Sequence, residues 1–451
     1  MFKKVLIANR GEIAVRVIRA CKELGLETVA VHSEADRNCL HARLADRSIC
    51  IGPGPAPDSY LNIPSIISAC EITGVDAVHP GYGFLSESED FAEICEAHGL
   101  AFIGPSKESI QKMGHKIEAK KIAREAGIEL IPGSNGVVSA DDPELPKIAR
   151  KIGYPVIVKA CGGGGGKGMR IVTREEALLE MVRLASNEAK LAFGDPGVYL
   201  EKFFEEPKHV EIQILADRSG KVVYLPERDC SVQRRYQKLI EETPSPAVGP
   251  KLRKKLGKAA RRVAQEVGYQ TVGTVEFLLD KDGQFYFMEM NTRIQVEHPI
   301  TEVLCGIDLV KWQIRLAAGE KLDFDEDDVR VNGHAMECRV NAEDPDHDFV
   351  PCPGRIEELV LPGGPGVRVD THIYSGYTIP SFYDSLLAKV IVGHQDRDTA
   401  IARMRRALGE FSIEGIKTTI PFHQKVLEHS AFRYGDVTTN FVAKHVFGGE
   451  I

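Results

Sequence analysis

The sequence predicts a large mixed protein, with a parallel α/β part followed by α+β parts, because its hydrophobic pattern changes along the chain. The first hundred residues alternate between strand-like and helix-like apolar patterns, as parallel α/β folds do. Further on, an Asp-Gly pair between two strand-like runs signals an antiparallel hairpin. A run of five glycines separates two other strand-like segments. A chain of 451 residues exceeds what one hydrophobic core usually serves, so two or three domains are expected.

The composition fits a globular protein and excludes several classes. Hydrophobic residues make up 43% of the chain, which is enough to fill real cores. The net charge of -8 and the pI near 6.0 give no reason to expect nucleic-acid binding. No run of about twenty apolar residues exists, so no membrane span is expected. Ten cysteines without a Cys-x-x-Cys pair, and an N-terminus without an apolar signal core, indicate reduced thiols in the cytoplasm.

The N-terminal part is predicted to begin like a Rossmann fold. Residues 4–8 have the pattern of a buried strand, residues 12–24 that of a helix ending at Gly25, and residues 27–31 that of a second strand. The turn after the first strand holds one glycine, Gly11, where a dinucleotide fingerprint needs three. This part is therefore expected to be Rossmann-like without a phosphate-binding loop. The glycine-rich loop at residues 79–87 is only a weak sign of a ligand cleft.

The glycine run at residues 162–166 predicts a flap over phosphate groups. It fails the P-loop pattern, because Gly168 stands where a hydroxyl residue should follow Lys167. P-loops and Rossmann loops also lead from a strand into a helix, whereas this loop joins two strand-like segments, residues 154–160 and 169–172. Backbone N–H groups in such a hairpin can wrap phosphate oxygens, and the glycines allow closure. A flexible linker is the alternative, and Lys159 and Lys167 at the edges argue against it.

A metal site is predicted at the second hairpin, where strand-like residues 274–279 and 284–289 flank an Asp-Lys-Asp-Gly segment. If Asp282 and Gly283 form a two-residue turn, Glu276 lies directly opposite Glu289. Facing carboxylates repel one another unless a cation lies between them. Two carboxylates and the amide oxygen of Asn291 are hard ligands that suit Mg²⁺ together with a nucleotide.

The residues after this hairpin predict an anion site beside the metal. In an extended strand, alternate side chains share one face. That face would carry Glu289, Asn291, Arg293, Gln295 and Glu297, with Met290, Ile294 and Val296 packed behind. The guanidinium of Arg293 presents paired donors that fit a planar anion. The ordinary alternative is a sheet with one wet face, but such faces usually carry Lys, Thr and Ser.

Taken in order, the motifs closely resemble those of the biotin carboxylase family within the ATP-grasp superfamily. The resemblance rests on the glycine run and on residues 7–14 (IANRGEIA), 79–85 (HPGYGFL), 227–231 (ERDCS), 289–298 (EMNTRIQVEH), 337–345 (ECRVNAEDP) and 383–386 (YDSL). It implies a Rossmann-like (pre-ATP-grasp) domain at residues 1–114 and an ATP-grasp domain at 115–330 with a mobile glycine-rich lid at about 131–203. A mixed α/β C-terminal biotin carboxylase domain would follow at 331–447.

The resemblance implies a two-step ligase reaction. ATP and bicarbonate yield carboxyphosphate, and the carboxyl group passes to N1 of biotin on a separate carrier protein. Mg²⁺ or Mn²⁺ is the implied metal, on Glu276, Glu289 and Asn291. The residues implied to contact ATP are Lys116, Lys159, Gly164, Gly165, Gly166, Met169, Glu201, Lys202, Phe203, Phe204, His209, Gln233, Tyr236 and Leu278.

The same resemblance assigns the catalytic residues, which are Arg293, Glu297, Arg339 and Lys238. Glu297 would be the general base that takes the bicarbonate proton. Arg339 would stabilise the enolate-like oxygen that biotin acquires on deprotonation. The residues implied to bind bicarbonate or biotin are Lys238, Arg293, Gln295, Val296 and Arg339.

Two positions depart from the family pattern. His115 precedes the phosphate lysine where an acidic or small residue is common, and Tyr236 stands where histidine is frequent. Tyr236 can still stack on a nucleotide or hydrogen-bond to it.

The chain is expected to work as one component of a multisubunit system. No methionine is followed by lysine, so we expect no biotin on this chain, and it ends at Ile451 without room for a carboxyltransferase. The expected partners are a biotin carboxyl carrier protein, carboxyltransferase subunits and a second copy in a homodimer. Acetyl-CoA carboxylase, which serves fatty-acid synthesis, is favoured over a split pyruvate carboxylase.

Two other classes of protein are weighed against this interpretation. An ATP-grasp ligase of amines or amino acids would share the flap and the metal carboxylates but would have no use for Arg293 and Arg339. A non-catalytic nucleotide sensor would have no use for Glu297 or the metal carboxylates.

Overall fold

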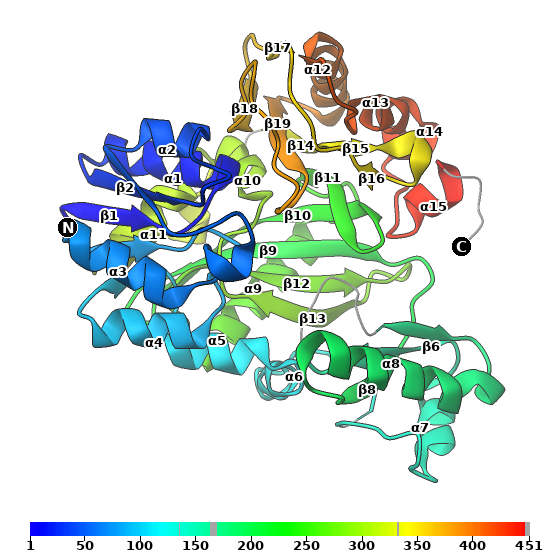
Figure 1. The fold of residues 1–451 in the computed structure, drawn as a ribbon. Coiled ribbons are helices and arrows are strands. Elements are labelled where there is room, and N and C mark those ends of the chain that lie inside the picture. Colours follow the sequence, from blue (N-terminus) through cyan, green and yellow to red (C-terminus); the bar gives the residue numbers. More distant parts are fainter. Residues whose placement is uncertain (135, 163–168, 332, 447–451) are drawn as a thin grey trace.

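The structure is a computed structural model that describes residues 1–134, 136–162, 169–331 and 333–446. Three larger sheets organise it (Figure 1), and the first is a parallel sheet in the order β3-β2-β1-β4-β5. Its strands are β1 (Lys4–Ile7), β2 (Glu27–His32), β3 (Arg47–Cys50), β4 (Ala77–His79) and β5 (Ala101–Phe102). The predicted Rossmann-like start is confirmed, and α1 (Gly11–Glu23) lies one residue from its predicted bounds. Other helices of this part are α2 (Leu40–Leu44), α3 (Ile63–Thr73), α4 (Glu89–Ala97) and α5 (Lys107–Gly114).

The second sheet is antiparallel and has eight strands in the order β13-β12-β9-β10-β11-β14-β19-β18. Its strands are β9 (Lys208–Ala216), β10 (Val222–Arg234), β11 (Gln237–Thr243), β12 (Thr271–Leu279), β13 (Phe285–Asn291), β14 (His334–Asn341), β18 (Val367–Thr371) and β19 (Leu386–His394). Pairing of β11 with β14, with Ile240 opposite Cys338, joins the middle and C-terminal segments into one continuous sheet.

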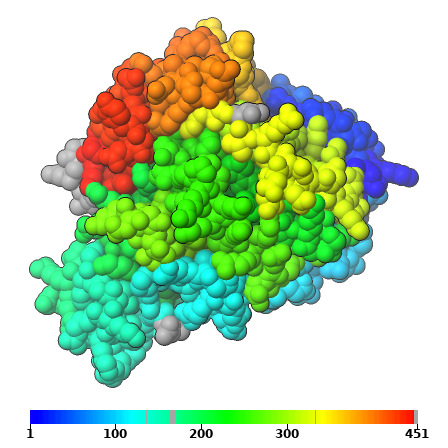
Figure 2. Space-filling view, turned by 180° about the vertical axis from the view of Figure 1, so that it is seen from behind, coloured from blue at the N-terminus to red at the C-terminus, as the bar shows by residue number. Residues whose placement is uncertain are grey.

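The third sheet holds three antiparallel strands, β6 (Val156–Ala160), β7 (Arg170–Val172) and β8 (Val198–Lys202). With α7 (Leu145–Ile152) and α8 (Leu178–Phe193) it forms a unit, hereafter the lid, that projects at the lower right of Figure 1 and the lower left of Figure 2. As predicted, the glycine run connects two strands, β6 and β7. Residues 163–168, including Gly164, Gly165 and Gly166, lie outside the described part of the chain, and the predicted flap motion concerns them.

Several hydrophobic cores hold the large sheet in place. Helix α9 (Pro250–Val267) buries Leu256, Ala260 and Val263 against Ile212 and Phe277 of the central strands. At the other end, α12 (Arg397–Glu410) and α13 (Ile420–Glu428) pack on β14 and β19. Among the described residues, no helix is both long and apolar enough to cross a membrane.

The remaining elements are short or peripheral. The helices are α6 (Lys116–Glu125), α10 (His298–Cys305), α11 (Leu309–Ala317), α14 (Ser430–Tyr434) and α15 (Phe441–His445), with 3-10 turns η1 (Ala56–Asp58), η2 (Glu175–Ala177), η3 (Glu326–Asp328) and η4 (Pro345–His347). The strands are β15 (Glu343–Asp344), β16 (Val350–Pro351), β17 (Leu359–Val360) and β20 (Ser412–Ile413).

The packing of α9 on β10 yields a prediction about stability. A Cβ added at Gly257 would lie 2.1 Å from the ring of Tyr224, whereas one at the exposed helical Gly409 would meet nothing within 4 Å. Gly257→Ala should therefore destabilise the protein by about 1–3 kcal/mol through overpacking. Gly409→Ala should be neutral or stabilise it by up to about 1 kcal/mol. Thermal unfolding of both variants checks this, and equal stabilisation by both would contradict the described packing.

Candidate active site

One cavity of about 580 Å³ lies between the N-terminal part, the lid and the large sheet. The predicted residues that line it are Lys116, Lys159, Met169, Lys202, Phe203, Phe204, His209, Gln233, Tyr236, Lys238, Glu276, Leu278, Glu289, Asn291, Arg293, Gln295, Val296 and Arg339. Two more, Glu201 and Glu297, are buried behind its wall and bind residues that line it. The structure thus brings together the predicted residues that it describes.

Glu276 faces Glu289 across β12 and β13, as predicted, but the turn is different. The predicted two-residue turn is wrong, because the backbone N–H of Asp280 donates to the carbonyl of Gln284 over a three-residue loop (2.9 Å). Gly283 occupies the left-handed region there, with φ of 79°, which glycine adopts without strain.

A β-bulge restores the predicted pairing. Beside the loop, Leu279 pairs with Phe285, which is one residue away from the predicted register. The register then shifts at Met288, before the Glu276–Glu289 pair. Bulges re-aim side chains, and Met288 and Glu289 both line the cavity although they are neighbours in one strand.

The extended strand predicted through residue 297 is wrong beyond Asn291, where β13 ends. Residues 292–297 form bends and a turn that lead into α10. The polar side chains still converge, since Arg293 and Gln295 line the cavity and Glu297 binds Arg339 at its wall.

Val296 also differs from its prediction. Ile294 and Met290 are buried behind the site as expected, but Val296 lines the cavity. Its carbonyl accepts a hydrogen bond from Lys389 Nζ at 2.8 Å, and the same ammonium lies 3.1 Å from Glu12. A buried lysine of β19 therefore fixes this backbone and ties it to the N-terminal part.

Lys238 lies among three buried carboxylates. Its Nζ is 2.6 Å from Glu211, 3.0 Å from Glu276 and 2.6 Å from Glu297. Burial opposes the charge of Lys238, but the anionic groups around it raise its pKa well above the ordinary value. Burial likewise opposes ionisation of Glu297, but Lys238 and Arg339 lower the pKa of Glu297 well below its ordinary value. Both groups are therefore charged at neutral pH.

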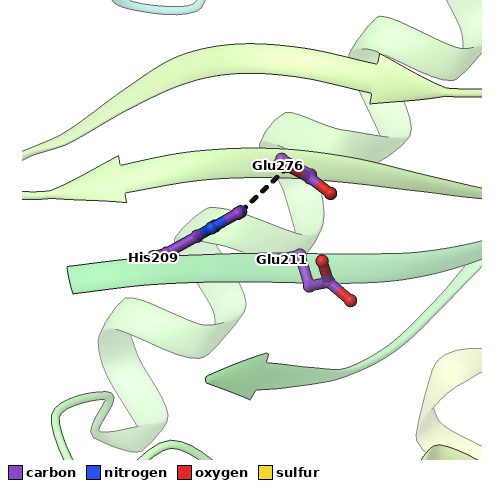
Figure 3. A group of neighbouring side chains, drawn as sticks. All are labelled: His209, Glu211 and Glu276. Carbon is purple, nitrogen blue, oxygen red and sulfur yellow. Dashed lines mark hydrogen bonds and ion pairs between the residues drawn. The ribbon is translucent and has the colours of Figure 1, made fainter. Parts of the chain in front are cut away.

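Glu276 is saturated with donors. Figure 3 shows His209 of β9 pointing toward Glu276 of the neighbouring β12, with Nε2 2.9 Å from Oε2, while Glu211 extends from the same strand as His209. Oε1 accepts hydrogen bonds from Lys238 at 3.0 Å, Asn291 at 2.8 Å and Gln295 at 3.0 Å. Burial opposes ionisation, but the cationic neighbours outweigh it and lower the pKa of Glu276.

Glu289 is different, since no hydrogen bond or ion pair links its side chain to any other residue that the structure describes. Burial and the facing Glu276 raise the pKa of Glu289. An open carboxylate opposite a second carboxylate, in a wall that also holds Lys116 and Lys159, fits a divalent cation that would remove the repulsion. Asn291 at present turns its amide oxygen to Arg293, at 3.0 Å.

Two arginines lie at the anion end of the cavity. The guanidinium of Arg293 donates to Glu87 at 2.9 Å and to the amide oxygen of Gln295 at 3.0 Å. The guanidinium of Arg339 donates to Glu241 at 2.6 Å and to Glu297 at 2.9 Å. Acceptors surround Arg293, because its Nη2 also donates to Asn291, whereas those of Arg339 lie along the edge formed by Nε and Nη2.

The lid supplies the opposite end. Lys159 of β6 lies 2.7 Å from Glu201, which also pairs with Lys120 of α6. Burial opposes ionisation of Glu201, but the two lysines lower its pKa to about 2. Lys202 donates to the carbonyls of residues 153 and 154, and Phe204 stacks on Tyr286 with 5.1 Å between ring centroids. The lining at this end is apolar at Ile157, Met169, Phe203, Phe204 and Leu278 and cationic at Lys116, Lys159 and Lys202.

Several residues of the site were not predicted from the sequence. They are Glu87, Lys120, Glu211 and Glu241. Glu211 could have been found, because it follows His209 by two positions in a strand and so shares its face. Glu87 ends the glycine-rich loop at residues 79–87. Lys120 and Glu241 carry no local signal.

A mixed cavity that joins lysines and facing carboxylates, beside the strands β6 and β7 that flank the glycine run of the sequence, is typical of a nucleotide-dependent ligase of the ATP-grasp class. Comparison with known families agrees. Residues 1–110 match "Biotin carboxylase, N-terminal domain", residues 115–325 match "Carbamoyl-phosphate synthase L chain, ATP binding domain", and residues 337–444 match "Biotin carboxylase C-terminal domain". The chain belongs to the biotin carboxylase family, whose members are ATP-grasp carboxylase ligases.

Curated relatives cover almost the whole chain. Biotin carboxylase of Nostoc sp. is 56% identical over 441 residues, which is 98% of each chain. A pyruvate carboxylase subunit of Methanothermobacter thermautotrophicus is 53% identical and covers 99% of this chain and 90% of its own.

Among solved structures, the biotin carboxylase domain dimer of Hydrogenobacter thermophilus 2-oxoglutarate carboxylase has a TM-score of 0.96 and 48% identity. It covers 100% of this chain and 99% of its own, and it holds MgADP, ADP and bicarbonate.

The open carboxylate of Glu289 yields a prediction about metal dependence. Glu289→Gln should raise the Mg²⁺ concentration for half-maximal turnover at least about tenfold, because a ligand is lost. Its thermal stability without metal should not fall, since the like-charge pair is removed. Metal titration of turnover and thermal unfolding measure these effects, with the exposed turn variant Asp282→Asn as control. A stability loss with unchanged metal dependence would refute the assignment.

Proposed function

We propose that this chain carboxylates biotin on a separate carrier protein, using bicarbonate, ATP and Mg²⁺ or Mn²⁺, by way of carboxyphosphate. One observation carries the proposal: Lys238, Glu297 and Arg339 form a continuous buried chain of contacts beside Arg293 at one end of the cavity. Such a row can bind a small anion, accept its proton and stabilise a second anion. Relatives named biotin carboxylase, and a similar structure holding bicarbonate and MgADP, support it.

Bicarbonate would lie between Arg293 and Lys238, with Gln295 and the backbone of Val296 beside it. A guanidinium presents paired donors to two oxygens of such an anion. Glu297 is ionised and can accept the bicarbonate proton as general base. The lowered pKa of Glu297 makes it a weak base in the free protein. A bound anion that also contacts Lys238 would weaken the ion pair between Lys238 and Glu297 and so raise the basicity of Glu297.

Phosphoryl transfer to bicarbonate depends mostly on position and charge. Lys116 and Lys159 would hold phosphate oxygens, together with backbone N–H groups of the glycine run. Phe204, His209, Gln233 and the other predicted ATP contacts would surround the nucleoside, with Met169 and Leu278 as apolar walls. A metal ion on Glu276, Glu289 and Asn291 would supply charge neutralisation when bound.

In the second step, the bond between the carboxyl carbon and the phosphate oxygen of carboxyphosphate breaks and the carbon bonds to N1 of biotin. The N1 proton would pass by relay through Glu297 to the released phosphate. The developing charge lies on the ureido oxygen of biotin. Arg339 would face that oxygen with the N–H groups not used by Glu241 and Glu297, which is stabilisation of an oxyanion by a fixed donor.

We further propose that the chain belongs to acetyl-CoA carboxylase and so to fatty-acid synthesis, with a biotin carboxyl carrier protein and carboxyltransferase subunits as partners. We also propose that the chain forms a homodimer in the cytoplasm. Its proposed domains are residues 1–114, 115–330 and 331–447, with a lid at about 131–203. The similarity to a pyruvate carboxylase component makes the split pyruvate carboxylase a second candidate. Carboxylation rates with purified carriers of the two systems distinguish them.

The central test is ATP hydrolysis by the purified chain with bicarbonate and free biotin, each present or absent. We expect hydrolysis that needs bicarbonate, and labelled carboxybiotin when biotin is added. Hydrolysis stimulated instead by amines or amino acids, without carboxybiotin, would favour the other ATP-grasp ligases. Nucleotide binding without turnover would indicate a sensor.

The two half-reactions should separate by mutation. Glu297→Gln should abolish both bicarbonate-dependent ATP cleavage and carboxybiotin formation, because the proton acceptor serves both. Arg339→Gln should lower carboxybiotin formation about a hundredfold to a thousandfold while retaining part of the ATP cleavage. Arg397→Gln, which removes a carboxylate-bound arginine away from the cavity, is the control. Equal loss of both activities in folded Arg339→Gln would refute this division.

A further inference from the structure

The orientation of Arg339 depends on a buried carboxylate that does not line the cavity. Glu241 of β11 is fully buried, and its Oε1 accepts hydrogen bonds from Arg339 Nε at 2.6 Å and lies 2.5 Å from Nη2. Glu297 Oε2 accepts from Nη2 at 2.9 Å. Two carboxylates from separate segments thus bind the edge of the guanidinium formed by Nε and Nη2, and neither contacts Nη1.

The backbone of Arg339 is fixed as well. Its carbonyl accepts hydrogen bonds from Thr419 Oγ1 at 2.9 Å and lies 2.6 Å from His423 Nε2. Thr419 precedes α13 and His423 belongs to it. With the main chain held on one side and the guanidinium edge on the other, the side chain has little freedom to swing.

A second carboxyl group lies opposite Glu241. Glu337 of β14 is its partner across the sheet, is fully buried, and has no hydrogen-bond partner for either oxygen among the described residues. Oε2 of Glu241 is unpartnered in the same way. Like charges directly opposite one another are destabilising, so one group of the pair must be neutral.

The proton belongs on Glu337. Burial raises the pKa of Glu337 well above its ordinary value. Burial also raises the pKa of Glu241, to about 7, and Arg339 offsets part of that effect. The neutral Glu337 allows Glu241 to carry the charge that binds the guanidinium. Lys238, Glu297 and Lys389 are the other charged groups near the pair.

We propose that Glu241 is a positioning residue for biotin carboxylation, which acts by orienting the guanidinium of Arg339, with Glu337 as its neutral partner. The inference rests on the proposed function, because it assigns Glu241 to the second step alone. Placing a donor on a small developing charge is sensitive to shifts of about 1 Å, which can cost about a hundredfold in rate. Among the described residues, the side chain of Glu241 has no hydrogen bond or ion pair with those proposed to hold ATP phosphates or metal, so the first step should not need it.

The test compares the half-reactions in Glu241→Ala and Glu241→Asp. Both should lower biotin carboxylation about tenfold to a hundredfold, while biotin-independent, bicarbonate-dependent ATP cleavage stays within about threefold of wild type and the KM for ATP is unchanged. Glu241→Gln keeps an oxygen that accepts from Arg339 and should recover much of the lost rate. Glu337→Gln replaces a neutral acid by a neutral amide and should leave both activities near wild type.

The neighbouring Glu242 provides a matched control. It is equally buried, points to the other face of β11 and binds Arg397 at 2.6 Å and His334 at 2.7 Å. Glu242→Ala should lower stability without separating the half-reactions. A purely structural role for Glu241 predicts the same behaviour, so equal loss of both activities in Glu241→Asp or Glu241→Gln overturns the inference.

Two experimental outcomes distinguish failure of the proposed function from failure of the role proposed for Glu241. Wild-type protein that forms no carboxybiotin refutes the proposed function itself. Active wild-type protein together with folded Glu241→Ala or Glu241→Asp that carboxylates biotin at the normal rate refutes only the role of Glu241. If Glu241→Ala does not fold, Glu241→Asp decides between these results.

Discussion

The ammonium group of Lys238 is the charge on which the rest of the site depends. Glu211, Glu276 and Glu297 come from β9, β12 and the turn before α10, and their carboxylates share one buried space. Without a cation between them, they could not all remain ionised. A lone buried lysine would be equally costly, so breaking any part of the group leaves an uncompensated charge. The stability of this region therefore depends on the same contacts that form the site.

The carboxylates of the site differ in whether the protein supplies donors to them. Glu211 is bound by Lys238 and by the fully buried Arg228, whose other N–H groups reach Gln213, Thr274 and Thr301. Both oxygens of Glu211 are therefore filled by donors from the protein itself. Glu289, in contrast, faces the cavity with no described partner. A carboxylate left open beside so many filled ones is available to a ligand, and its repulsion by Glu276 favours a cationic one.

Sequence reasoning succeeded where neighbouring positions decide the structure. The Rossmann-like start and the hairpin depend on periodicity and turn residues within a few positions. The pairing of Glu276 with Glu289 was predicted from a wrong turn, which put the register beside the loop off by one residue. The bulge at Met288 shifts the register back by one residue, so the predicted pair still forms. A bulge of this kind has no residue signature. The contact of Arg339 with Glu241 spans 98 positions, and nothing local in the sequence specifies which carboxylate meets which cation.

Continuity of the large sheet explains which parts of the site are fixed. Lys238, Glu276 and Arg339 stand on strands of one hydrogen-bonded sheet, because β11 pairs with β14. Lys159 belongs to the separate sheet of the lid, which contacts the remainder through connections such as the pairing of Lys120 with Glu201. Proton transfer and oxyanion stabilisation need groups held within a fraction of an ångström, and a single sheet provides this. Entry and release of a nucleotide require, by contrast, that the other end of the cavity can widen. A shift of the lid that carries Lys159, one of the proposed phosphate contacts, would therefore leave the acid–base geometry proposed at the other end undisturbed.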